Sequence, residues 1–355
     1  MTSGDGGRGT GRRVVLRAGA SAVLLGAAGC TSGAKSAVAP ASSTQDPTLT
    51  AAPTAAPTTT QAATQLPNPP LWQPGPGEIQ PDVKRRAVEL VAALGAWPPG
   101  GQGAGAARAR VAALGLPPGL ADGAGRLAPA VPEAALEVVD AQYGGILADS
   151  ASVLVVCRQW TRQPDGSVAA GGITVDVRLS RAEPRWTVTA VHPGDPGPAA
   201  ASPASPASPA PPASPAAPTH AVAKVLAEPR IELPPEAAAD LLSGTVHDSV
   251  LTAMLRLAGP YALSVSVVRT GHPLDVFGTT RPSDHPLGRA FDVWRIDGRA
   301  VVDPATPRQL IESFMRDAAA AGSYNVGGPV AIAGVGNQFF TDDTHHDHVH
   351  VGFTS

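Results

Sequence analysis

The sequence predicts an α+β protein made of two folded modules that are joined and preceded by disordered segments. Three observations lead to this prediction. Many of the 38 prolines gather in two long stretches that are also rich in alanine and serine. Apolar residues recur at helical spacing on both sides of the second stretch. Short apolar runs with the spacing of strands also occur on both sides of it.

Composition and charge narrow the class of protein. Charged residues make up 15% of the 355-residue chain, and the formal net charge is -3. The sequence has no basic stripe with interleaved aromatic residues, so we expect no nucleic-acid partner. Its two cysteines, Cys30 and Cys157, are too few for a secreted disulfide scaffold. Cys157 follows the apolar run 153–156, which predicts a buried and inert thiol.

The first thirty residues have the features of an export signal. The pair Arg12 and Arg13 precedes a short apolar run, 18–28, which ends just before Cys30. About eleven residues are too few for a membrane-spanning helix, which needs roughly 20. The segment resembles a twin-arginine signal peptide followed by a bacterial lipobox, whose cysteine is acylated. We therefore expect residues 1–30 to be a signal peptide, and the protein to be exported and lipid-anchored through Cys30 at the extracytoplasmic face of the cell membrane.

Two low-complexity segments set the predicted domain boundaries. Residues 31–77 consist mainly of Ala, Pro, Ser and Thr and contain almost no large apolar residue. Such a segment buries too little surface to offset its chain entropy, so a disordered stalk is predicted. Residues 195–219 repeat Ala-Ser-Pro and are predicted to be a disordered linker. The folded modules are then residues 78–194 and 220–355.

The first module, residues 78–194, is predicted to be a small α+β domain in which helices precede strands. Apolar spacing indicates helices at 83–94, 106–114 and 132–143. Alternating or apolar runs indicate strands at 152–160, 172–179 and 185–191. This order of elements is similar to the cone-shaped fold of the nuclear-transport-factor type. No catalytic cluster is visible in this part of the sequence.

The second module, residues 220–355, is predicted to contain both helices and strands. Helices are indicated at 235–242, 248–257 and 307–321, and a strand at 262–268. Two polar clusters, 283–292 and 344–351, lie on either side of the last helix. Four of the nine histidines of the chain fall within six residues of the second cluster. This concentration predicts a metal site.

His285, Asp292 and His350 have the residue types of a zinc site that keeps an open position. Residues two apart in a strand point the same way, so His348 should lie on the same face as His350. Gly288 permits a tight bend that would bring His285 beside Asp292. Zinc lowers the pKa of a water molecule bound at its open position to near neutrality.

The two clusters resemble the motifs of the LAS zinc peptidases, which include D-Ala-D-Ala carboxypeptidases, penicillin-insensitive murein endopeptidases and the metal domain of hedgehog. Residues 283–292 look like the first motif of this family, and residues 347–351 look like the second. The resemblance implies a small antiparallel sheet with flanking helices and a Zn²⁺ ion held by the two histidines and the aspartate. It also implies a catalytic base at His348 or at Asp347. His345 matches a further active-site histidine of the murein endopeptidases.

The sequence departs from the family in two places. Many carboxypeptidases have a Ser-Gly-Tyr-Arg strand whose arginine holds the substrate, whereas this chain has Thr270-Gly271-His272-Pro273. We therefore expect Arg269, or alternatively Arg281, to bind the substrate together with His345. Asp347 also stands where other members have a longer glutamate.

The resemblance implies a zinc-dependent hydrolase that cleaves peptidoglycan peptides in the cell wall. Endopeptidase and carboxypeptidase activity both stay open, because the sequence does not identify the scissile bond. The alternative is a non-catalytic, zinc-containing module that binds the wall without cleaving it. The missing substrate arginine favours this alternative.

Overall fold

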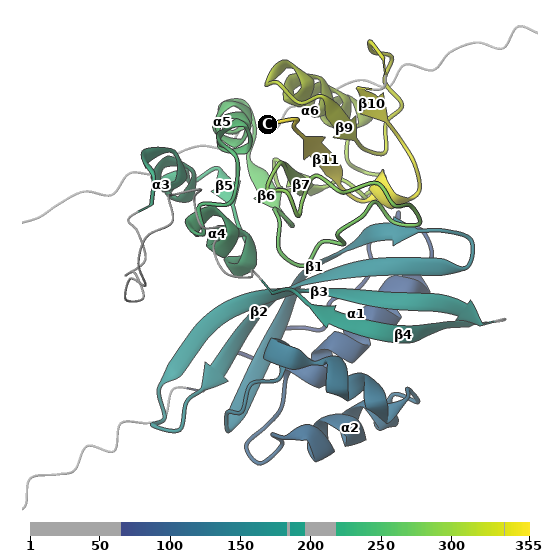
Figure 1. The fold of residues 1–355 in the computed structure, drawn as a ribbon, viewed down its shortest axis with the longest axis vertical. Coiled ribbons are helices and arrows are strands. Elements are labelled where there is room, and N and C mark those ends of the chain that lie inside the picture. Colours follow the sequence, from purple (N-terminus) through teal and green to yellow (C-terminus); the bar gives the residue numbers. More distant parts are fainter. Residues whose placement is uncertain (1–64, 183–184, 196–217, 337) are drawn as a thin grey trace, which may run out of the picture. The chain divides into compact units, whose positions relative to one another are not determined.

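The computed structural model describes residues 65–182, 185–195, 218–336 and 338–355 (Figure 1). Within these ranges the fold is mixed α+β, with two separate sheets. The predicted signal peptide, Cys30, residues 31–64 of the predicted stalk and residues 196–217 of the predicted linker lie outside the described residues. No helix in the described ranges is both long and apolar enough to cross a membrane.

The first sheet is antiparallel, with the strand order β1-β2-β3-β4. Its strands are β1 (Glu133–Ile146), β2 (Ser150–Arg162), β3 (Val168–Ala182) and β4 (Arg185–Pro193). The helical elements of this module are α1 (Pro81–Gly95), α2 (Ala104–Ala113), η1 (Pro118–Gly123) and η2 (Gly125–Leu127). Buried residues of α1, α2 and the sheet form one apolar core. The predicted strands and the first two predicted helices are confirmed, each displaced at its ends by a few residues.

The predicted helix at 132–143 is wrong, because this segment forms strand β1. Its glutamates, alanines and leucine favour a helix locally, but β2 offers a partner for nearly the whole segment. Tertiary pairing therefore overrides local propensity. The register shifts twice, between Val138 and Asp140 and between Tyr143 and Gly145. Such bulges bend a strand and redirect its side chains.

The apolar run of β2 is buried on both faces of the first sheet. Val153 and Cys157 pack in the core beneath the helices, whereas Leu154 and Val156 pack against Val267 of the second module. Successive residues of a strand point to opposite faces, so a continuous apolar run fits a sheet that is covered twice. The thiol of Cys157 is buried, as predicted, and burial raises its pKa.

Part of the predicted stalk is packed on the first module. Leu66 is only 8% exposed, and Trp72 packs against the core of the module. The predicted boundary at residue 77 is therefore wrong, and the packed region begins earlier. The sequence does not predict this packing, because the segment is mainly polar and rich in proline. Its two packed apolar residues, Leu66 and Trp72, do not follow a helical or strand period.

The second sheet has the strand order β10-β9-β11-β7-β6-β5, with β8 paired to β7. Its strands are β5 (Ile231–Glu232), β6 (Leu263–Val265), β7 (Ala290–Ile296), β8 (Arg299–Ala300), β9 (Asn325–Gly327), β10 (Phe339–Phe340) and β11 (Val349–Gly352). The helical elements are α3 (His220–Ala227), α4 (Pro235–Leu242), α5 (Asp248–Ala258), α6 (Arg308–Ala320) and the 3-10 helix η3 (Thr344–His346). The sheet is not purely antiparallel as the resemblance implied, because β5 pairs with β6, and β10 with β9, in parallel.

Alternation along β7 separates the core of the second module from its polar face. Phe291 and Val293 are fully buried in a core with Phe314 of α6. Asp292 between them points to the other face of the sheet. That face carries the residues of the candidate site.

A buried carboxyl lies where α4 approaches the first module. Glu236 in the first turn of α4 has a side chain that is 3% exposed and forms an ion pair with Arg126 of η2. Burial raises the pKa of this carboxyl to about 7, with a smaller upward contribution from Asp240, and Arg126 only partly opposes the shift. The folded protein therefore keeps a proton that the unfolded chain has lost above pH 4.5, its ordinary pKa.

This difference predicts a dependence of stability on pH. The stabilising contribution of Glu236 is fully present below its unfolded pKa and is lost as the pH rises through about 7. Relative to Glu236→Gln, the wild type should lose roughly 2–3 kcal/mol of unfolding free energy between about pH 4.5 and pH 7.5. Urea unfolding of both proteins at several pH values measures this. Glu312→Gln, in an exposed pair with Arg316 on α6, is the control and should track the wild type. Parallel curves for wild type and Glu236→Gln would contradict the prediction.

Candidate metal centre

Three side chains from separate segments converge on one point of the polar face. The Nε2 atom of His285, the Oδ1 atom of Asp292 and the Nδ1 atom of His350 lie 3.1 Å from one another. His285 and Asp292 are fully buried, and His350 is 7% exposed. The structure thus brings together the three predicted zinc ligands.

The register of the second sheet places Asp292 and His350 face to face. His350 of β11 is the direct partner of Asp292 of β7 in an antiparallel pair. The backbone N–H of Asp292 donates to Val267 and its carbonyl accepts from Ser266, so both groups are used on the side away from β11. Asp292 and His350 therefore form a non-hydrogen-bonded pair, the kind in which facing side chains approach most closely.

A tight turn brings His285 to the same point. The backbone N–H of Gly288 donates to the carbonyl of His285 over 2.8 Å, and Gly288 has a φ of 70°. A Cβ atom at Gly288 would lie 2.1 Å from the carbonyl oxygen of Thr245. Glycine is required on both counts, since an L side chain would be strained and would clash. The predicted bend at Gly288 is confirmed.

The donor atoms have the chemistry of a cation site. Nδ1 of His285 donates to the carbonyl of Val268 over 2.8 Å, which leaves Nε2 as the ring nitrogen that faces the carboxylate of Asp292. Burial lowers the pKa of His350 to about 4, although Asp292 opposes the shift. Burial disfavours ionised Asp292, yet the neighbouring imidazoles hold its pKa well below the usual range. Two imidazole nitrogens and one carboxylate oxygen thus converge on one point, and these are atoms that can hold a cation.

The spacing of the donor atoms fits zinc. Nitrogen and oxygen ligands lie about 2.0–2.1 Å from zinc, so two ligands of a tetrahedral ion lie roughly 3.4 Å apart. The observed separations of 3.1 Å approach this value. Two histidines and one carboxylate are also a donor set of catalytic zinc sites, which keep a fourth position open.

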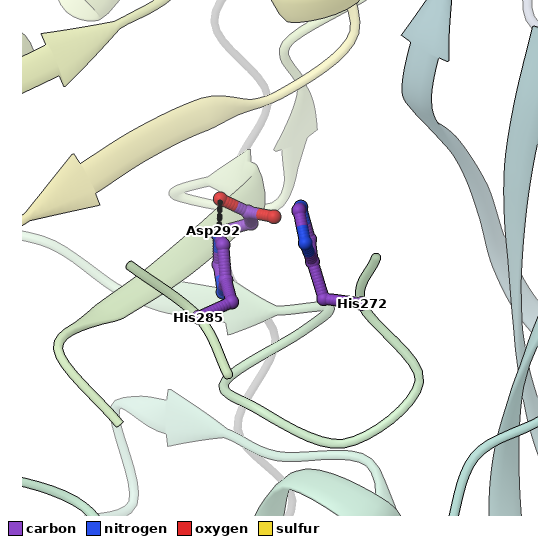
Figure 2. Close-up of side chains that lie close together, drawn as sticks. All are labelled: His272, His285 and Asp292. Atoms are coloured by element: carbon purple, nitrogen blue, oxygen red, sulfur yellow. Dashed lines mark hydrogen bonds and ion pairs between the residues drawn. The ribbon is translucent and has the colours of Figure 1, made fainter. Parts of the chain in front are cut away.

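His272 stands beside this triangle and was not predicted as a site residue. Its ring stacks on His285, with the centroids 4.2 Å apart and the planes at 15°, and the Asp292 carboxylate lies near the free ends of both rings (Figure 2). The ligand atoms of the three residues lie within 4.8 Å of one another. The in-plane lone pairs of parallel rings run side by side instead of converging on one ion. We therefore place His272 next to the metal centre, in the wall of the cavity described below.

Gln142 of strand β1 holds the second oxygen of the predicted ligand Asp292. Its Nε2 atom donates to Oδ2 of Asp292 over 2.6 Å, and the side chain of Ser266 donates to its Oε1 atom. Gln142 is 1% exposed. No sequence signal pointed to it, because it belongs to the other module and to a segment that looked helical.

His348 lies on the same side as His350, as the strand parity predicted. Its Nδ1 atom donates to Oδ1 of Asp347 over 2.6 Å, and its Nε2 atom lies 3.8 Å from Oδ1 of Asp292. Burial lowers the pKa of His348, but Asp292 and Asp347 outweigh it and raise the pKa to about 9. The Asp347 hydrogen bond fixes the orientation of the ring and leaves Nε2 directed to the candidate metal centre.

Asp347 lies behind His348 and does not reach the cavity. Its Oδ2 atom accepts from Lys84 Nζ over 2.6 Å and from the backbone N–H of Tyr143 over 3.1 Å. Burial opposes its ionisation, but Lys84 and His348 together lower its pKa. A carboxylate with three donors and a lowered pKa is a poor base. The structure thus favours His348 over Asp347 as the proton carrier, and Asp347 as the residue that orients it.

A second group of possible ligands, Glu78, His346 and Asp347, already surrounds a cation. The ammonium group of Lys84 pairs with both Glu78 and Asp347 and is fully buried. Although burial opposes it, these two carboxylates raise the pKa of Lys84, so the lysine stays charged. The charge of this group is balanced by the chain itself, so it does not call for a metal ion.

The metal centre opens on a cavity of about 840 Å³. Its walls include His272, His285, His348 and His350, and they also include Tyr143 and Gly144 of the first module. His345, a predicted substrate-binding residue, lines this cavity. The centroids of the His345 and His348 rings are 5.1 Å apart.

Arg269 is not among the described residues that line the cavity. Its Nε atom donates to the carbonyl of Pro286, and its backbone N–H donates to Asp240. The neighbouring arginine considered from the sequence, Arg281, lines the cavity instead. The structure therefore favours Arg281 over Arg269 as a candidate, because Arg281 lines the cavity while the side chain of Arg269 bonds to the backbone of Pro286.

Comparisons of the chain with protein-family models, with curated proteins and with solved structures found no match. The geometry of the site is therefore the basis for inferring a function. The site consists of three convergent donor atoms that could hold a metal ion, a histidine oriented by a buried aspartate, and an adjoining cavity.

Proposed function

We propose that this protein is an exported, membrane-anchored zinc peptidase that hydrolyses peptidoglycan peptides. In this proposal residues 220–355 form a LAS-like zinc domain, and the first module is a cone-like accessory domain. The observation that carries the proposal is the triangle of His285, Asp292 and His350 at the wall of a large cavity, with His348 beside it. Export and lipidation rest on the sequence of residues 1–30.

Each group of the site has a distinct role in peptide hydrolysis. When bound, zinc supplies Lewis-acid activation of the substrate carbonyl and of a water molecule. His285, Asp292 and His350 hold the ion. His348 presents Nε2 to the reacting atoms, donates a proton to the leaving amine and recovers one from the water that the hydrolysis consumes. Asp347 holds the ring of His348 in the tautomer that this transfer needs.

The cavity can accommodate an extended peptide with a charged end. Arg281 is the guanidinium among its described wall residues and is our choice for binding a substrate carboxylate. His345 donates from Nδ1 to Asp342 over 2.7 Å, which leaves Nε2 to accept a hydrogen bond from a substrate N–H group. Together these residues would orient the peptide across the metal centre.

The proposal is tested with the purified wild-type protein. We expect about one zinc ion per chain, by elemental analysis, as required for a single three-ligand site. Incubation with muropeptides should release new amines, detected by mass spectrometry. A chelator should stop the release, and added zinc should restore it. Zinc binding with no new amines would support the alternative, a wall-binding module, and absence of zinc would reject both.

A further inference from the structure

The first module contributes polar atoms directly to the candidate metal centre. Its strand β1 bears Gln142, which contacts Asp292, and Tyr143, whose backbone N–H contacts Asp347. Its helix α1 bears Lys84, which pairs with Asp347. Two of the residues on which the proposed chemistry depends are therefore held by a module that the sequence left without a role.

We infer that Gln142 is a positioning residue of the metal centre, through which the first module sets the affinity for the metal ion. The inference rests on the proposed function, because it assumes that His285, Asp292 and His350 bind a metal. It assigns the first module a part in assembling the site, in addition to any role in reaching the substrate.

The hydrogen bond from Gln142 gives the two oxygens of the Asp292 carboxylate different partners. Oδ1 faces His285 and His350, whereas Oδ2 accepts the hydrogen bond from Gln142 over 2.6 Å. A carboxylate bonded in this way offers one oxygen to the metal and cannot easily rotate to offer both. Such partners orient a ligand, and their replacement typically lowers metal affinity about 10- to 100-fold.

The orientation of Gln142 is itself fixed. The hydroxyl of Ser266 donates to the Oε1 atom, so the amide nitrogen is the atom that faces Asp292. Ser266 is 1% exposed, like Gln142, so bulk water cannot readily replace either hydrogen bond. The bulges of β1 on both sides of Gln142 give the strand the local course that lets this side chain reach the other module.

Removing the side-chain amide of Gln142 measures how much it contributes to the affinity for zinc. In the full chain, Gln142→Ala should weaken zinc binding about 10- to 100-fold, measured by competition with a chromophoric chelator. Cobalt can replace zinc as a spectroscopic probe. With Oδ2 released, the carboxylate can supply a second oxygen, so we expect the visible cobalt absorption of Gln142→Ala to change in shape and intensity.

Two further variants separate positioning from general damage. Gln159→Ala removes a buried glutamine of the neighbouring strand β2 that donates to the carbonyls of Gly95 and Leu127, remote from the metal. It should keep wild-type zinc affinity even if it lowers stability. Ser266→Ala should give a smaller loss of affinity than Gln142→Ala. The double variant should lose less than the two single losses combined, because both act through one hydrogen-bonded chain.

The outcomes distinguish this inference from the proposed function. Equal zinc affinity and an unchanged cobalt spectrum in Gln142→Ala, with wild-type protein that binds metal, would overturn the inference alone. If the wild type binds zinc without cleaving muropeptides, peptidase activity fails while the role of Gln142 is still measured. If the wild type binds no metal, both proposals fail. Thermal unfolding of the metal-free variants shows whether each has folded, and Ser266→Ala carries the test if Gln142→Ala has not.

Discussion

Replacement of His350 by alanine should abolish zinc binding and peptide hydrolysis together. His350 supplies one of three donor atoms that lie 3.1 Å apart, and it is the direct strand partner of Asp292. Zinc binds to four-ligand structural sites with a free energy of about 10–16 kcal/mol. Divided among four ligands, this gives roughly 3 kcal/mol or more for each ligand. We therefore expect zinc affinity to fall by roughly 10²-fold or more.

Zinc content after dialysis and cleavage of muropeptides are the two measurements for this variant. His192→Ala is a suitable control, because His192 is an exposed histidine in strand β4 of the other sheet. It should retain both properties. Wild-type zinc affinity in His350→Ala would show that the three donor atoms do not form the metal site, and the proposed function would then fail.

Replacement of His348 by glutamine should abolish most of the activity while leaving zinc bound. His348 is hydrogen-bonded to Asp347 and presents its other ring nitrogen 3.8 Å from the carboxylate oxygen of Asp292. Positioned proton transfer contributes typically about 10²–10⁴-fold to an enzymatic rate. We expect kcat to fall by this factor with little change in zinc content, since His348 is not one of the three convergent donors.

Rate and zinc content must both be measured for this variant. His220→Gln, at the exposed start of α3, provides the matched histidine control. A His348→Gln protein with wild-type kcat would assign the proton transfer to another residue. Loss of zinc in parallel with the activity would instead make His348 a ligand.

The position of Lys84 explains why His348 and Asp347 have different surroundings. Lys84 forms buried ion pairs with Glu78 and Asp347, and Asp347 also contacts His348. A buried charge is tolerated only with a partner, so Lys84 and Asp347 stabilise each other in the charged state. The ring of His348 is left as the group that faces the metal centre.

The sequence by itself was enough to predict the α+β class, five of the six α-helices, the strands at 152–160, 172–179 and 185–191, and the residue types of the three candidate ligands. These properties are local, because they follow from residue type, from periodicity and from a glycine that permits one bend. Strand alternation predicts the face on which Asp292 and His350 each lie, and the turn at Gly288 brings His285 beside Asp292.

Tertiary structure alone decided the state of segment 132–143 and the residues that surround the ligands. A helix-forming segment became strand β1 because β2 pairs with it. Gln142 and Lys84 reach the site, and Arg269 turns away from it, through contacts between segments far apart in the chain. Hydrogen bonds and ion pairs of this kind depend on how two modules pack, and no spacing within a single segment of sequence encodes them.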